Sequence, residues 1–136
     1  MRNLQPILLV EDDRVDRLTV QRALKEIEVK NPVDIAANGE EALALLRDRS
    51  YKKPAIILLD LNMPKMNGLE FLREIKQDAD LKHIPVIVLT TSGEDRDKLE
   101  SFNLCVAGYM IKPLDYFKFV EMLRAIQVYW TFSELP

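Results

Sequence analysis

Acidic side chains follow two apolar runs of this sequence, at positions where they could bind a cation. Glu11 and Asp12 come directly after the run that ends at Val10, and Asp60 comes directly after a later run. Three carboxylates at one place repel one another and raise each other's pKa unless a cation lies among them. Mg²⁺ prefers such oxygen ligands, completed by water, a backbone carbonyl or a phosphate oxygen. The pattern predicts a Mg²⁺ site, with the backbone carbonyl near Asn62 as a further donor.

The acidic run at Glu11 also has a simpler explanation when it is taken alone. Asp12 or Asp13 could cap the helix that follows, because aspartate is a preferred N-cap residue. Both interpretations fit the first acid pair equally well. The residues that follow the later apolar runs favour the cation site.

Lys112 and Thr90 supply what phosphoryl transfer requires in addition to a metal. A lysine can bind one phosphoryl oxygen while the metal binds another, and a threonine hydroxyl can bind a third. An aspartate carboxylate can itself be the nucleophile and form an acyl phosphate, and Asp60 is the candidate. Singly, Lys112 could only neutralise the acids and Thr90 could only be a turn hydroxyl. Together these residues predict phosphorylation of Asp60.

The elements that must position these residues can be inferred from hydrophobic periodicity. Short apolar runs bounded by polar or turn residues predict strands at 6–10, 33–37, 55–59, 85–89 and 106–111, and segments with helical spacing separate them. Strict alternation implies right-handed parallel crossovers with helices on both faces of one sheet. The fold class is therefore α/β, a doubly wound open parallel (βα)₅ sheet in a three-layer sandwich. Ligands of such sheets lie at the carboxyl ends of the strands.

Composition limits the class of protein and of partner. The chain has 136 residues, 48% of them hydrophobic, and a net charge of -3, which together predict a single domain over 1–136 with its core at about 5–128. The charge argues against DNA or an anionic membrane as the main partner. Cys105 is the only cysteine and the apolar runs are too short to span a membrane, so we expect a cytoplasmic location.

Four segments carry a resemblance to a known family: Leu-Leu-Val-Glu-Asp-Asp, Leu-Asp-Leu-Asn-Met-Pro-Lys-Met-Asn-Gly, Val-Leu-Thr-Thr-Ser and Gly-Tyr-Met-Ile-Lys-Pro. Together they resemble the bacterial response regulator receiver domain, over residues 5–128. The resemblance implies the CheY-like strand order 2-1-3-4-5 and a signalling phosphoacceptor that is not an enzyme, apart from promoting its own phosphotransfer and dephosphorylation. It implies Asp60 as phosphoacceptor and, as metal ligands, Glu11, Asp12, Asp60 and the main-chain oxygen of Asn62.

The same resemblance assigns roles at the ends of the last two strands. Thr90 is the switch hydroxyl, Tyr109 is the switch aromatic, and Lys112 contacts the phosphoryl group. Receivers typically have a cis peptide bond between this lysine and the next residue, which implies that Pro113 is a cis-proline.

The C-terminal segment, Ala-Ile-Gln-Val-Tyr-Trp-Thr-Phe-Ser-Glu-Leu-Pro, resembles the end of small response regulators that partner cyanobacterial phytochromes. The resemblance implies a sensor histidine kinase, specifically a phytochrome, as phosphodonor, and a homodimer. Tyr129, Trp130 and Phe132 are the candidate interface residues, in a helical extension and tail at 129–136. The alternative is that this tail covers its own helix.

Three other functions are possible for a fold of this class, and the residues fit each of them less well than phosphorylation. A haloacid-dehalogenase-like phosphatase needs a second acid two residues after its nucleophile, where this chain has Asn62. A flavodoxin-like FMN site needs a phosphate loop that the acids after Val10 would repel. A receiver-like interaction module that is never phosphorylated needs only the fold, and it remains the main alternative.

Overall fold

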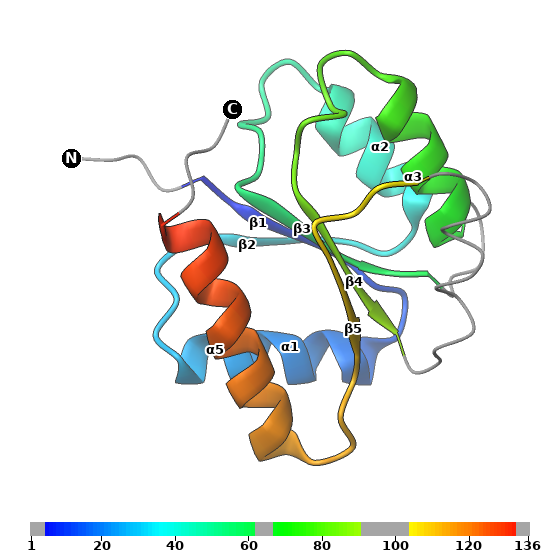
Figure 1. Cartoon of the computed structure of the whole chain (residues 1–136). Coiled ribbons are helices and arrows are strands. Elements are labelled where there is room, and N and C mark those ends of the chain that lie inside the picture. The colour runs from blue at the N-terminus through cyan, green and yellow to red at the C-terminus, as the bar shows by residue number, and fades with distance from the viewer. Residues whose placement is uncertain (1–4, 62–66, 91–103, 133–136) are drawn as a thin grey trace.

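The structure, a computed structural model, describes residues 5–61, 67–90 and 104–132, and for 129–132 the backbone alone. Five parallel strands form one sheet in the order β2-β1-β3-β4-β5, as predicted. Helices cover both faces, with α2 and α3 on one and α1 and α5 on the other (Figure 1). The bounds are β1 Ile7–Val10, α1 Arg14–Glu26, β2 Val33–Ala36, α2 Gly39–Arg47, β3 Ile56–Asp60, α3 Gly68–Gln77, β4 Val86–Thr90, β5 Gly108–Ile111 and α5 Tyr116–Phe132.

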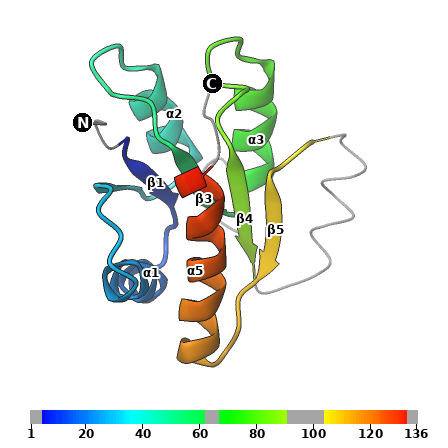
Figure 2. The ribbon, with the colours of Figure 1, turned by 60° about the vertical axis from the view of Figure 1, so that its left-hand side comes forward.

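The alternation of side chains along the central strands divides the core into two layers. Leu8 and Val10 of β1 pack with α2 and α3, whereas Ile7 and Leu9 pack with α1 and α5. Successive side chains of a strand point to opposite faces, so a strand covered on both faces must be apolar throughout. Figure 2 shows α5 running along the sheet beside α1. This continuous burial fixes the central strands, and with them the residues at their carboxyl ends.

Two predicted strands begin and end one residue later than the apolar pattern indicated, and the last residue of each is one of the candidate site residues. Asp60 is the last residue of β3, where it lies opposite Leu89, and Thr90 is the last residue of β4, where it lies opposite Ile111. A polar residue can continue the backbone ladder after the apolar run has ended. Both side chains are therefore held by strand pairing.

Side-chain caps start the helices that follow β1 and β2 and the helix α3. Asp13 accepts a hydrogen bond from the Asp16 amide, Asn38 from Glu41, and Asn67 from Glu70. An N-cap side chain satisfies one of the otherwise unpaired N–H groups of the first turn. Of the two predicted candidates, Asp13 is the residue that caps α1, which leaves Asp12 available for the site. No helix in the described ranges is long and apolar enough to cross a membrane.

Candidate functional site

Glu11, Asp12 and Asp60 meet at the carboxyl edge of the sheet. One carboxylate oxygen from each lies within 4.8 Å of the others. Glu11 is 2% exposed, while Asp12 and Asp60 are partly buried. A set of oxygen ligands from closely spaced carboxylates suits a hard divalent cation such as Mg²⁺. The donor chemistry therefore fits the metal predicted from the sequence.

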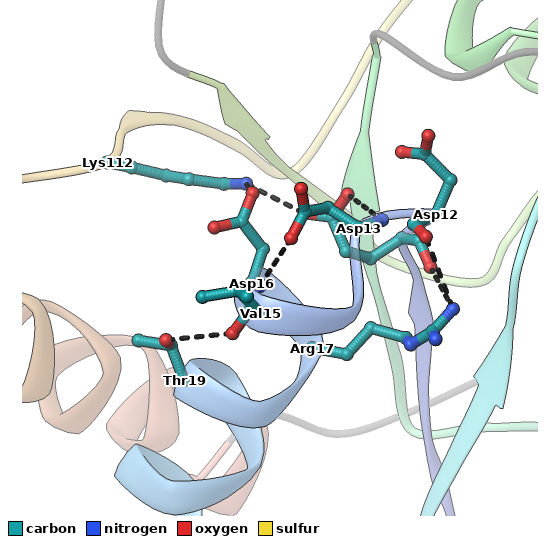
Figure 3. A network of polar contacts seen from close by, with 8 residues as sticks. Asp12, Asp13, Val15, Asp16, Arg17, Thr19 and Lys112 are labelled. Atoms are coloured by element: carbon teal, nitrogen blue, oxygen red, sulfur yellow. Dashed lines mark hydrogen bonds and ion pairs between the residues drawn. The ribbon is translucent and has the colours of Figure 1, made fainter.

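Lys112 reaches this acidic cluster from the end of β5 (Figure 3). Its Nζ lies 2.8 Å from Glu11 Oε1 and 3.6 Å from Asp16 Oδ2. Its backbone N–H donates to the Thr90 carbonyl across 2.7 Å, which anchors the residue to β4. The backbone hydrogen bond of Lys112 thus helps to hold its ammonium group near the acids, in addition to the attraction between their charges.

Thr90 and Tyr109 lie on the neighbouring strands β4 and β5. Thr90 is fully buried, and the Tyr109 ring is partly buried against the core layer formed with α2 and α3. In the sheet register, Tyr109 lies opposite Val88 and Thr90 opposite Ile111. Two of the predicted switch residues are therefore close in the sheet, and each is held by a paired strand.

The electrostatics of the cluster reflect burial and mutual repulsion. Burial, followed by contact with the Asp60 carboxyl group, raises the pKa of Glu11 above its usual value despite the opposing effect of Lys112. Burial also raises the pKa of Asp12. Burial alone would lower the pKa of Lys112, but its hydrogen bond and charge interaction with Glu11 outweigh this and raise it. Lys112 is consequently charged. The charged forms of the acids are disfavoured as they stand, and a bound cation would favour them.

Two residues of the first turns of α1, Asp16 and Arg17, belong to the site although the sequence reasoning did not identify them. Arg17 Nη1 donates to the Glu11 carbonyl at 3.3 Å and to the Asp12 carbonyl at 3.4 Å, so it braces the backbone of the acid pair (Figure 3). Helical side chains lean toward the helix N-terminus. The sequence signal that could have identified them is therefore a charged residue in the first turns of the helix that follows a strand-end acid pair.

The Lys112–Pro113 peptide bond differs from the prediction. No cis peptide bond occurs among the described residues, so this bond is trans and the expectation of a cis-proline is wrong. The trans form is intrinsically favoured before proline. Because Lys112 Nζ reaches Glu11 with a trans bond, the position of the ammonium group does not require the cis form.

Some predicted residues lie outside what the structure describes. Asn62, the proposed backbone ligand, falls in the undescribed segment 62–66. The side chains of Tyr129, Trp130 and Phe132 are likewise outside the described part, although their backbone completes α5. Their roles stay predictions.

Comparison with known proteins identifies a family model and several relatives that match this chain over most of its length. Residues 7–124 match the model of the response regulator receiver domain. The chain is 41% identical over 128 residues to response regulator Rcp1 of Synechocystis sp., and the match covers 91% of this chain and 87% of Rcp1. The crystal structure of the phosphorylated cyanobacterial phytochrome response regulator RcpA superimposes with a TM-score of 0.86 at 38% identity, covering 98% of this chain and 99% of RcpA. The crystal structure of the Mn²⁺-bound form of Rcp1 superimposes with a TM-score of 0.84 at 39% identity, covering 97% of this chain and 99% of Rcp1.

Proposed function

This chain belongs to the response regulator receiver domain family, and we propose on that basis that Asp60 accepts a phosphoryl group from the histidine of a sensor kinase. The observation that carries the proposal is the meeting of three carboxylates within 4.8 Å with a lysine ammonium 2.8 Å from one of them. An acidic cluster that holds a lysine ammonium group and can also bind a metal cation suits a nucleophile that must receive a phosphoryl group.

The proposed chemistry is an in-line displacement at phosphorus. A carboxylate oxygen of Asp60 attacks the phosphorus atom, the bond to the histidine nitrogen of the donor breaks, and an acyl phosphate forms. Glu11 and Asp12 would hold Mg²⁺ with Asp60, and Asn62 would contribute its main-chain oxygen. The bound ion would neutralise negative charge around the incoming phosphoryl group. Manganese in the related Rcp1 structure supports a divalent cation here.

Lys112 and Thr90 are proposed to recognise the phosphoryl oxygens after transfer. Lys112 would bind one oxygen, and the Thr90 hydroxyl would donate to another from the end of β4. Phosphorylation adds roughly two negative charges at Asp60, a large change in a site of this size. Movement of Thr90, followed by a turn of Tyr109 toward the sheet, would carry the change to the surface of β5.

The proposed partners are a kinase of the phytochrome type and a second copy of this chain. Similarity to Rcp1 and to the phytochrome response regulator RcpA supports the first of these. Exposed apolar side chains on β5, in the loop after it and on α5 support the second, namely Ile111, Leu114, Phe117 and Val128. Exposed apolar patches commonly mark interaction sites.

The phosphorylation proposal can be tested with a small-molecule donor. Incubation with acetyl phosphate and Mg²⁺, followed by intact-protein mass spectrometry, should show one phosphoryl group on the wild-type chain. Asp60→Asn should abolish the added mass, because the amide keeps the shape but is not a nucleophile here. Asp13→Asn is the matched control, since it removes a nearby carboxylate and retains a good N-cap.

The outcomes separate the proposal from its main alternative. Labelling of Asp60→Asn at the wild-type level would place the acceptor at another residue. A wild-type chain that is not labelled by acetyl phosphate or by a kinase, and that does not respond to Mg²⁺, would instead favour an interaction module that is never phosphorylated.

A further inference from the structure

Lys112 is shared between two carboxylates of unequal character. Glu11, which is buried, holds Nζ at 2.8 Å, and Asp16, whose side chain is 47% exposed, holds it at 3.6 Å. Glu11 is part of the cluster that could bind a cation, together with Asp12 and Asp60, and Asp16 is not a member of that cluster. The second ion pair therefore attaches the lysine to α1, beside the proposed phosphorylation site.

Both ends of the Lys112–Asp16 pair are anchored to regular structure. Asp16 lies in the first turn of α1, where its amide donates to the Asp13 side chain across 3.0 Å. Lys112 is fixed through its backbone N–H, which donates to the Thr90 carbonyl across 2.7 Å. Figure 3 shows the lysine extended from the end of β5 toward this turn. The pair thus joins two rigid elements rather than two surface side chains on mobile loops.

Movement of Lys112 toward a group on Asp60 would affect the two ion pairs differently. Glu11 itself contacts the Asp60 carboxyl group, so a lysine that turns toward Asp60 can remain beside Glu11. Asp16 is not one of the three carboxylates that meet at Asp60, and its 3.6 Å contact with Nζ is already the longer of the two, so we expect the same movement to weaken the pair with Asp16 first. The pair with Asp16 would then favour the resting position of the lysine.

We propose that Asp16 is a positioning residue that holds Lys112 in its resting place and so opposes its engagement of a phosphoryl group on Asp60. This inference rests on the proposed function, because it assigns Asp16 a part in the same phosphorylation. Asp16 weakens the affinity of the site for the phosphoryl group and favours the unphosphorylated state. A ligand shifts the equilibrium between two states only as far as its affinity differs between them.

The expected size of the effect follows from the exposure of Asp16. Ion pairs with one well-exposed partner are weak, and loss of one changes an equilibrium by about two- to fivefold. Salt screens interactions between exposed charges, so the effect should shrink at high ionic strength.

The experiment measures binding of beryllofluoride, a mimic of the aspartyl phosphoryl group, to the full chain at saturating Mg²⁺. Fluorine NMR titration should show that Asp16→Asn binds about two- to fivefold more tightly than wild type. Asp13→Asn is the matched control, because it removes the same charge from the neighbouring cap position, where the carboxylate bonds the helix instead of Lys112. Thermal melts would establish that both variants are folded.

Two further readouts distinguish a positioning role from a general effect of charge or stability. The difference between Asp16→Asn and Asp13→Asn should shrink as salt is added. The nitrogen NMR signal of the Lys112 ammonium group in the free protein should shift in Asp16→Asn and stay at its wild-type position in Asp13→Asn.

The possible results separate this inference from the function on which it rests. Equal affinities for the two variants, or weaker binding by Asp16→Asn, in a chain whose wild type binds beryllofluoride would overturn the role of Asp16 alone. Failure of the wild-type chain to bind beryllofluoride with Mg²⁺ would overturn the proposed phosphorylation and this inference with it.

Discussion

Glu11 is a buried acid whose environment disfavours its charged form. Burial, followed by contact with the Asp60 carboxyl group, raises its pKa in the folded state above the ordinary 4.5. An acid with a raised folded pKa contributes stability that is present below its unfolded pKa and is lost as the pH rises through the folded value. At neutral pH the cluster therefore costs stability, and a bound cation would recover it.

We expect Mg²⁺ to raise the melting temperature at neutral pH and to do so less at mildly acidic pH, where protons compete for Glu11. A ligand that binds only the folded state at 100 times its dissociation constant stabilises it by about 2.7 kcal/mol. Calorimetry with and without millimolar Mg²⁺ would measure the shift, and Asp12→Asn should reduce it. The absence of a shift in the wild type at neutral pH would argue against the metal site.

The site residues differ in how far they could be predicted from the sequence. Glu11, Asp60 and Lys112 were predictable because parallel strands bring their carboxyl ends to one edge, whatever the details of side-chain packing. Asp16 and Arg17 were not predicted, because their contacts depend on how α1 is rotated over the sheet. The trans bond before Pro113 was not predicted because the family resemblance pointed to the rarer isomer.

At the scale of elements, Gly68 controls how closely α3 approaches the end of β3. Its amide donates to the Leu61 carbonyl across 2.9 Å, and a Cβ there would overlap the Leu61 Cα and lie 2.8 Å from the Asp60 carbonyl oxygen. Both atoms belong to the backbone, which cannot move aside without moving Asp60. Glycine fits this position, and a residue with a side chain does not, because the backbone at the start of α3 closely approaches the backbone at the end of β3.

Gly68→Ala should therefore destabilise the fold and slow phosphorylation of Asp60. Forcing a methyl group into a packed contact costs about 1–3 kcal/mol. Urea denaturation would measure the loss of stability, and the rate of labelling by acetyl phosphate would report the displacement of Asp60. Glu70→Ala, at an exposed position of the same turn, is the control and should change both by much less. Wild-type behaviour of Gly68→Ala would contradict the close approach.

Tyr51 ties the segment before β3 to the edge strand β2. Its hydroxyl donates to Asp34 Oδ2 across 2.8 Å, and its ring packs against the core layer formed with α2 and α3. Burial, followed by this hydrogen bond, raises the pKa of Tyr51 above its ordinary 10.0. The contribution to stability is therefore present below pH 10.0 and is lost as the pH rises toward the raised folded pKa.

Tyr51→Phe should lower the free energy of unfolding by about 1 kcal/mol at neutral pH, since the ring is kept and one hydrogen bond is lost. Denaturation of both proteins over a range of pH would test the origin of the difference. The advantage of the wild type should be constant below the ordinary tyrosine pKa and should decline above it. A difference that persists unchanged in alkali would point to packing instead of the hydrogen bond.

The elements themselves were predicted well where burial and pairing coincide. The apolar run at 106–111 predicted a longer final strand than the observed β5, Gly108–Ile111, because Val106 and Ala107 belong to the apolar run without being part of the strand. Conversely, Asp60 and Thr90 pair in the ladder although they are polar. Hydrophobic patterning indicates which residues are buried, and strand bounds depend on backbone pairing.

At the scale of the whole molecule, strand order was the property that periodicity could not supply. Alternating strands and helices predict a doubly wound parallel sheet, but several strand orders satisfy that pattern. The order β2-β1-β3-β4-β5 came from the family resemblance and is confirmed. It puts β5 at one edge of the sheet, next to β4, where its outer side faces away from the other strands (Figure 2).

A stripe of exposed side chains with an apolar residue at each end runs along one side of α5. Phe117 is 73% exposed and Val128 is 54% exposed, and eleven residues of an α-helix make about three turns, so both lie on the same side of α5. Glu121 and Arg124 lie between them and are also exposed. In a symmetric dimer the same patch faces itself, so the glutamate of one copy could pair with the arginine of the other.

We therefore expect the chain to form a dimer at micromolar concentration through β5 and α5. Sedimentation should show that Phe117→Glu and Val128→Glu shift the protein toward monomer, because each places a charge on the stripe. Leu18→Glu, at an exposed position of α1, is the matched control and should leave the dimer intact. A chain shortened after Gln127 removes Val128 together with Tyr129, Trp130 and Phe132 and tests the sequence-based interface. If the shortened chain is monomeric while both Phe117→Glu and Val128→Glu remain dimeric, those aromatic residues hold the dimer. A monomeric wild type would exclude this dimer.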